Sequence, residues 1–119
     1  MYKMWSLREV RVRYVTRRGV CGYVPVTGWV RQDRPYVAVL RDRATGRYLL
    51  YAVGAGNRIT PAQYEDAASA RAVAAQLLAL PIDWGMGSKW RLMRALVERR
   101  LLDVVKMLVE PPVAVSVSV

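Results

Sequence analysis

Apolar and polar residues alternate along the start of the chain, which is the pattern of a half-buried β-strand. Within residues 8–15, one face carries Val10, Val12 and Tyr14, and the other carries Glu9, Arg11, Arg13 and Val15. A turn that contains Gly19 leads into a second apolar run at residues 20–26, in which Pro25 predicts an edge position or the end of the strand. Residues 29–30 predict a short continuation. The opening of the chain is therefore expected to form an antiparallel strand pair.

The middle of the strand region predicts a β-hairpin. Two β-prone apolar runs, residues 36–41 and 47–53, flank a short loop that carries Gly46, a residue suited to a left-handed turn position. Pairing Arg41 with Arg47 places apolar side chains on both faces, so we expect this hairpin to be central and covered twice. Helices of the same chain would cover one face, and nucleic acid or a second copy of the chain the other.

The second half of the chain has helical patterning. Thr60 and Gln63 form a capping-box sequence, which predicts an alanine-rich helix over residues 60–80. A glycine-containing loop with an exposed Trp84 follows. Ser88 then caps a second predicted helix over residues 89–109.

That second helix carries an apolar seam at spacings of three, four, four, three and four residues, which is typical of helix–helix contacts. The seam consists of Trp90, Met93, Val97, Leu101, Val104 and Leu108. Packing on the sheet of the same chain would explain it. The alternative is a homodimer, which the unusual apolar width of the helix favours.

Strands first and helices afterwards predict an α+β fold, with a four-stranded, mainly antiparallel meander followed by two helices packed on one face. A single domain is expected over residues 1–110, with a strand half at 8–53 and a helical half at 60–109 joined by a loop at 54–58. Residues 111–119 form an uncharged C-terminal tail that alternates Val with Ala and Ser. We expect this tail to dock on a sheet edge or to fray.

The charge is strongly basic and unevenly placed. The net charge is +10, and arginine supplies most of it. Residues 1–59 hold twelve basic and three acidic residues, whereas residues 60–119 hold seven and six. A hot habitat or a codon bias could raise the arginine content, but neither would confine the excess of arginine to one half of the chain. The partition favours an anionic partner on the strand half.

Tyrosine and tryptophan are interleaved with these arginines, as in grooves that hold single strands by stacking. The order of four strands followed by a helix also resembles, in element order alone, single-strand-binding modules of the Whirly and PUR type. The candidate nucleic-acid-binding residues are Arg11, Arg13, Arg17, Arg18, Tyr23, Trp29, Arg31, Arg34, Tyr36, Arg41, Arg43, Arg47 and Tyr48.

The sequence lacks most of the residue patterns that enzymes use for catalysis. It has no His, a single Cys21 and no paired carboxylates, so we expect no catalytic residues, no metal and no cofactor. A lone cysteine and the lack of a membrane-length apolar run favour the cytoplasm. The primary hypothesis is a non-catalytic protein that binds single-stranded DNA or RNA. The alternatives are a structural or interaction module that dimerises through the C-terminal helix, and a fragment of a larger protein.

Overall fold

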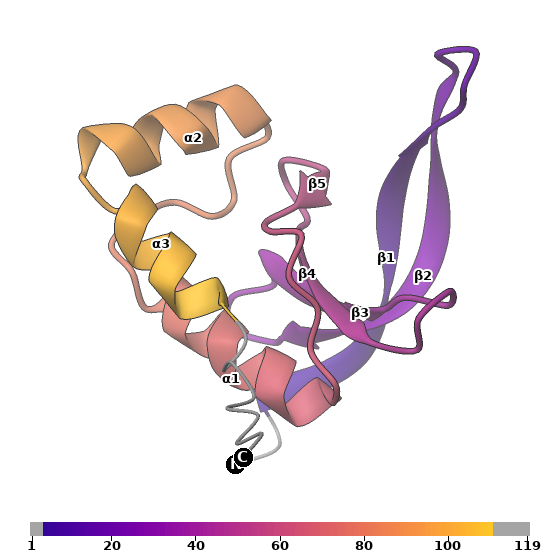
Figure 1. Ribbon diagram of the computed structural model, residues 1–119, viewed down its shortest axis with the longest axis horizontal. Coiled ribbons are helices and arrows are strands. Elements are labelled where there is room, and N and C mark those ends of the chain that lie inside the picture. Colours follow the sequence, from indigo (N-terminus) through magenta and orange to yellow (C-terminus); the bar gives the residue numbers. More distant parts are fainter. Residues whose placement is uncertain (1–3, 111–119) are drawn as a thin grey trace, which may run out of the picture.

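The computed structural model describes residues 4–110 and shows an α+β fold with one five-stranded antiparallel sheet and three helices (Figure 1). The strands follow one another in the sheet in chain order, as a meander. They are β1 (Trp5–Val15), β2 (Cys21–Arg31), β3 (Val37–Arg41), β4 (Tyr48–Ala52) and β5 (Asn57–Arg58). The helices are α1 (Ala67–Leu78), α2 (Lys89–Glu98) and α3 (Leu102–Val109). The α+β class is confirmed, with one strand and one helix more than predicted.

Strands β1 and β2 form a long hairpin that extends beyond the rest of the sheet. They pair over eleven residues each, from Trp5 opposite Arg31 to Val15 opposite Cys21. Strand β3 pairs only with the last part of β2, at two positions. Pro25 lies beyond these positions and has no N–H with which to bind a third strand. The outer part of β1–β2 therefore projects as a two-stranded arm, and β2 continues unbroken through the predicted break near Gly28 (Figure 1).

The β3–β4 hairpin forms where predicted, but its register differs by one residue. Arg41 pairs with Tyr48 rather than with Arg47. Gly46, with a φ of 71°, closes the connecting loop and donates from its N–H to the carbonyl of Asp42. A one-residue slip moves every side chain of a strand to the other face. Leu50 consequently joins the helix-facing side of the sheet.

Two apolar clusters cover the two faces of the β3–β4 hairpin. On one face, β3 and β4 pack against α1, with Val37, Leu50 and Leu77 fully buried. On the other face, Val10 and Val30 of the β1–β2 hairpin pack with residues of β3 and β4, including Ala38, Leu40 and Tyr51. The sheet therefore curls so that its own first strands cover the second face. Neither nucleic acid nor a second copy of the chain is needed there.

Helix α1 begins at Ala67, seven residues after the predicted N-cap Thr60. The backbone N–H and C=O of Tyr64 instead bond to Tyr48 of β4, which keeps this segment extended. Gln63 donates to Asp42 at 2.8 Å rather than closing a capping box. Asp66 is the actual N-cap and accepts from the Ser69 N–H at 2.6 Å. The prediction of a start at Thr60 was wrong because a sheet contact competes with the local capping sequence.

The predicted helix over residues 89–109 is two helices. Ser88 caps α2 as expected, but Arg100 has a φ of 56° and ends it. The Leu101 N–H bonds to the Leu96 carbonyl and the Arg100 N–H to the Val97 carbonyl, which is the Schellman arrangement. The chain then turns into α3. Without glycine or proline at this point, the sequence carries no strong breaking signal.

Trp84 was predicted to be exposed and is in fact 2% exposed. Its indole Nε1 donates to the carbonyl of Leu77 at 2.7 Å, in the last turn of α1. A buried indole N–H needs such a partner, and the end of a helix supplies free carbonyls. The loop before α2 is thereby fixed against the core.

Candidate nucleic-acid interface

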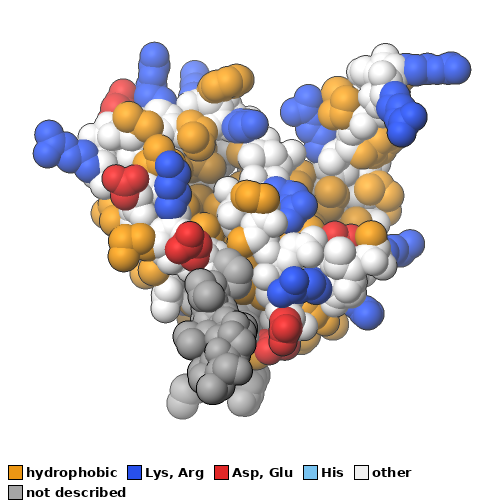
Figure 2. Space-filling model, in the orientation of Figure 1, with side chains coloured by type: hydrophobic (Ala, Val, Ile, Leu, Met, Phe, Trp, Pro, Cys, Tyr) orange, Lys and Arg blue, Asp and Glu red, His pale blue; other side chains and the backbone are white. Residues whose placement is uncertain are grey.

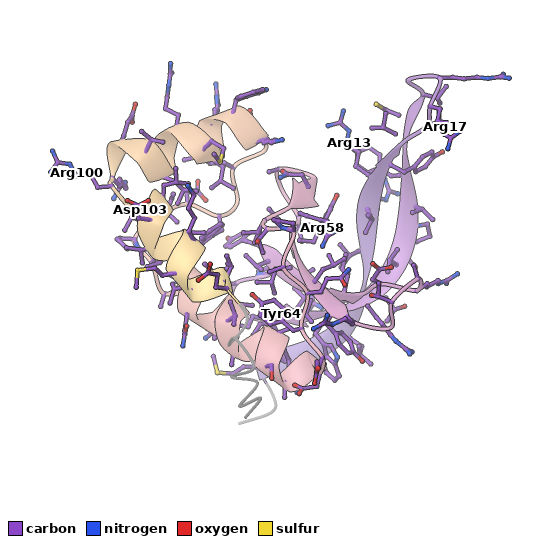
Figure 3. The ribbon with its side chains drawn as sticks, in the orientation of Figure 1. Arg13, Arg17, Arg58, Tyr64, Arg100 and Asp103 are labelled. Carbon is purple, nitrogen blue, oxygen red and sulfur yellow. The ribbon has the colours of Figure 1, made fainter. Side chains whose placement is uncertain are left out.

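The arm formed by β1 and β2 carries the first group of predicted residues. Arg11, Arg13, Arg17 and Arg18 are all exposed. Arg13 projects from β1 toward the side on which α2 and β5 lie, whereas Arg17 lies at the far end of the arm (Figure 3). The outer end of the arm shows basic and no acidic side chains in the space-filling view (Figure 2). The structure thus brings these four arginines together on one projecting element.

Arg13 is held in place by the sheet. Its backbone N–H donates to the hydroxyl of Tyr51 at 3.0 Å, which ties β1 to β4 across the curl. Its guanidinium donates to the sulfur of Cys21 at 3.5 Å, and this bond raises the pKa of Arg13. The guanidinium is exposed and remains charged at all ordinary pH values. A positioned cation of this kind is suited to an anionic group.

Two exposed aromatic rings accompany the arginines of the arm. Tyr23 is opposite Arg13 in the hairpin and is 63% exposed. Tyr14 is also exposed and lies across Gly22, where an added Cβ would stand 2.5 Å from the tyrosine hydroxyl oxygen. Because neighbouring residues of a strand point to opposite faces, Tyr14 and Tyr23 offer rings on the two faces of the arm. Tyr14 was not among the predicted nucleic-acid contacts, although its position in the strand, between arginines, could have indicated it.

The second group of predicted residues lies at the β3–β4 turn. Arg41, Arg43 and Arg47 are exposed there. Asp42 lies between them in the sequence but faces away, because it accepts from the side chain of Gln63 at 2.8 Å and from the Ala44 N–H at 2.9 Å. These three arginines therefore form a second basic cluster, away from the tip of the arm.

The remaining arginines of the prediction have structural partners. Arg31 forms a two-pronged ion pair with Asp33, at 3.0 and 3.1 Å. Arg34 donates to the carbonyl of Leu78 at the end of α1. The structure does not bring either residue into the arm.

The remaining aromatic residues of the prediction also have structural roles. Trp29 is half-buried on the helix side, with the guanidinium of Arg71 stacked 4.5 Å from its ring centre. Tyr48 is half-buried in the same cluster. Tyr36 is exposed but lies against Gly85. A base could not stack on the helix-side rings without displacing the core.

Almost none of the positive charge is used in internal ion pairs. Over residues 4–110, the pair between Arg31 and Asp33 is the only ion pair within 4.0 Å. Arg58 on β5 is exposed and lies on the side of the molecule toward which Arg13 points (Figure 3). Sequence reasoning missed Arg58 because a two-residue strand leaves no periodic signal. The basic surface is therefore available to an external anion.

The residues of the predicted dimer seam do not form one continuous surface in the structure. Trp90, Met93 and Val97 are exposed on α2, and Trp90 is 79% exposed. Leu101 and Leu108 are half-buried in the helix-side core, and Val104 is exposed on α3. The break at Arg100 divides the seam into two separate parts.

The chain matches no protein-family model, no curated protein and no solved structure. In the described part of the chain, no helix is long and apolar enough to cross a membrane. Residues 4–110 likewise contain no cluster of three or more acidic or cysteine side chains that could hold a metal ion.

Proposed function

We propose that this protein is a non-catalytic nucleic-acid-binding protein whose main contact is the β1–β2 arm. The observation that carries the proposal is the arm itself, a projecting strand pair with four exposed arginines and no carboxylate within ion-pairing distance of them among the described residues. Arginine binds phosphate through two parallel hydrogen bonds. A cytoplasmic location remains part of the proposal.

Single-stranded DNA or RNA is the proposed form of the ligand. Tyr14 and Tyr23 expose their rings beside the arginines, and unpaired bases stack on such rings with about 1–3 kcal/mol each. In a duplex the bases are already stacked on one another, so these rings would contribute little. The β3–β4 turn offers a further basic cluster for the phosphates of a longer strand.

The test is binding of a fluorescently labelled single-stranded oligonucleotide, followed by anisotropy at several salt concentrations. We expect affinity to fall steeply with salt, with a slope of about −0.7 per phosphate contacted. The double variant Arg17→Ala/Arg18→Ala should weaken binding and reduce that slope by about 1–2. Tyr23→Ala should weaken binding by about 1 kcal/mol or more.

The matched control is Arg91→Ala/Arg94→Ala, which removes the same charge from the exposed surface of α2. This control should retain most of the affinity. No binding at low salt, or equal losses in the two double variants, would contradict the proposal. Equal affinity for a duplex of the same sequence would contradict the single-strand preference.

Self-association through α2 is the second candidate, and the exposed Trp90 favours it. Trp90, Met93 and Val97 lie three and four residues apart on one helix face. A second copy would cover them. Light scattering should then give twice the chain mass, and Trp90→Ala should return the protein to a monomer. A monomeric mass at high concentration would exclude this candidate.

A further inference from the structure

An apolar cavity of about 240 Å³ lies between β5, the segment that follows it, and the α2–α3 pair. Its walls are aliphatic side chains and the ring of Trp84, with Leu92 and Leu96 from α2 and Val105 and Val109 from α3. Helix α2 contacts the rest of the fold sparsely, chiefly through α3, which leaves this space beneath it. The cavity is separate from the β1–β2 arm, none of whose residues lines it.

Three cations border the cavity and no carboxylate does. Arg58 comes from β5, Lys89 from the first turn of α2, and Lys106 from α3. Each comes from a different element, so only the tertiary structure brings them together. A cavity with apolar walls and a rim of this kind is complementary to an amphipathic anion.

Asn57 also lines the cavity, but its polar atoms are not available to a ligand. Its Nδ2 donates to the Arg58 carbonyl at 2.8 Å. Its Oδ1 has no hydrogen-bond partner among the described residues and exposes almost no surface, so a molecule in the cavity does not reach it. The cavity therefore selects a ligand by apolar contact and by charge.

We propose that this cavity binds a small carboxylate with an apolar body. The carboxylate would meet Arg58, Lys89 and Lys106, and the apolar body would pack against the aliphatic walls and Trp84. The volume corresponds to roughly eight water molecules, so the ligand is smaller than a typical drug-sized molecule. This activity is independent of nucleic-acid binding by the arm.

Isothermal titration calorimetry with three probes tests the role of the anion. Indole-3-acetate and 1-naphthylacetate both have an apolar ring and a carboxylate, whereas indole lacks the carboxylate. We expect the two carboxylates to bind with similar affinity, because the cavity offers no accessible partner to the indole N–H. Indole should be weaker, because it leaves the cations without an anion.

Variants of exposed residues test the rim without disturbing the core. Lys89→Ala or Lys106→Ala should weaken indole-3-acetate binding by about two- to fivefold. Arg94→Ala on the same helix does not line the cavity and should leave it unchanged. Arg17→Ala/Arg18→Ala should also leave it unchanged.

The proposal is overturned if none of the probes binds at millimolar concentration. It is also overturned if indole binds as tightly as indole-3-acetate, since the cations would then have no role. A loss in Arg94→Ala equal to that in Lys89→Ala would show a general charge effect rather than a site. None of these results depends on whether the arm binds nucleic acid.

Discussion

The hydroxyl of Tyr64 donates a hydrogen bond to the carbonyl of Val109, which joins the segment before α1 to the last residue of α3. Tyr64 is 2% exposed. The same residue bonds through its backbone to Tyr48 of β4. One tyrosine thus fastens the end of the helical half to the sheet. Helix α3 also packs against α1, with Val105 and Val109 buried in the core, and the bond from Tyr64 fixes its last residue.

Tyr64→Phe should lower the free energy of unfolding by about 1–2 kcal/mol at neutral pH, because the buried Val109 carbonyl loses its donor. Burial raises the pKa of Tyr64 to about 12, above its ordinary value near 10. The stabilisation is therefore complete below pH 10 and is lost as pH rises through 12. Urea unfolding of both proteins should show the same difference at pH 7 and pH 9 and a smaller difference at pH 11. A difference that stays constant would contradict this assignment.

Gly28 allows β2 and β3 to approach each other. A Cβ at this position would lie 2.4 Å from Cδ2 of Leu40 and 2.9 Å from the backbone oxygen of Val39. Gly28→Ala should therefore destabilise the protein by about 1–3 kcal/mol, as overpacking does. In Gly22→Ala the new methyl meets only the exposed ring of Tyr14, which can move, and the cost should stay below about 0.5 kcal/mol. Thermal unfolding of the two variants compares them directly, and equal losses would refute the close approach.

Arg100 occupies a left-handed position at the end of α2, which costs a residue with a side chain about 1–2 kcal/mol. Glycine avoids this cost but loses more conformational entropy on folding. Arg100→Gly should therefore raise the stability by about 0.5–1 kcal/mol and increase Tm by a few degrees. Arg99→Gly is the control, because Arg99 has a φ of −89° and gains nothing from glycine. A lower Tm for Arg100→Gly would show that the two helices are not joined in this way.

Asp66 caps α1, and hydrogen bonds from Ser69 lower the pKa of its carboxyl group below the ordinary value. A lowered pKa means that the cap stabilises the fold above about pH 4 and that this contribution is lost as pH falls through the folded pKa. Asp66→Ala should lower Tm at pH 7, with a smaller effect at pH 3. Asp66→Asn keeps the cap and should show no such pH dependence. Circular dichroism melts at pH 3, 5 and 7 measure both variants.

Several local features could be read from the sequence. The first strand, the glycine turn between β3 and β4, and the Ser88 cap are short-range signals, and all three are confirmed. The predicted burial of alternate side chains in β1 holds at Val10 and Val12, whereas Tyr14 is exposed. The start of α1 was wrong because the backbone pairing of Tyr64 with Tyr48 outweighed a correct local capping sequence. The division of the long helix was missed because an arginine, not a glycine, takes the left-handed position.

The sequence by itself determined the sheet-then-helix order and the excess of arginine in the first half, because strand periodicity and charge are properties of each segment alone. The tertiary structure decided which arginines are together. It paired Arg31 with Asp33, took Arg34 to the end of α1, and left Arg11, Arg13, Arg17 and Arg18 on the arm. It also closed the second face of the sheet by curling β1 and β2 over it. Curl and register arise from packing between segments far apart in the chain, which no local pattern encodes.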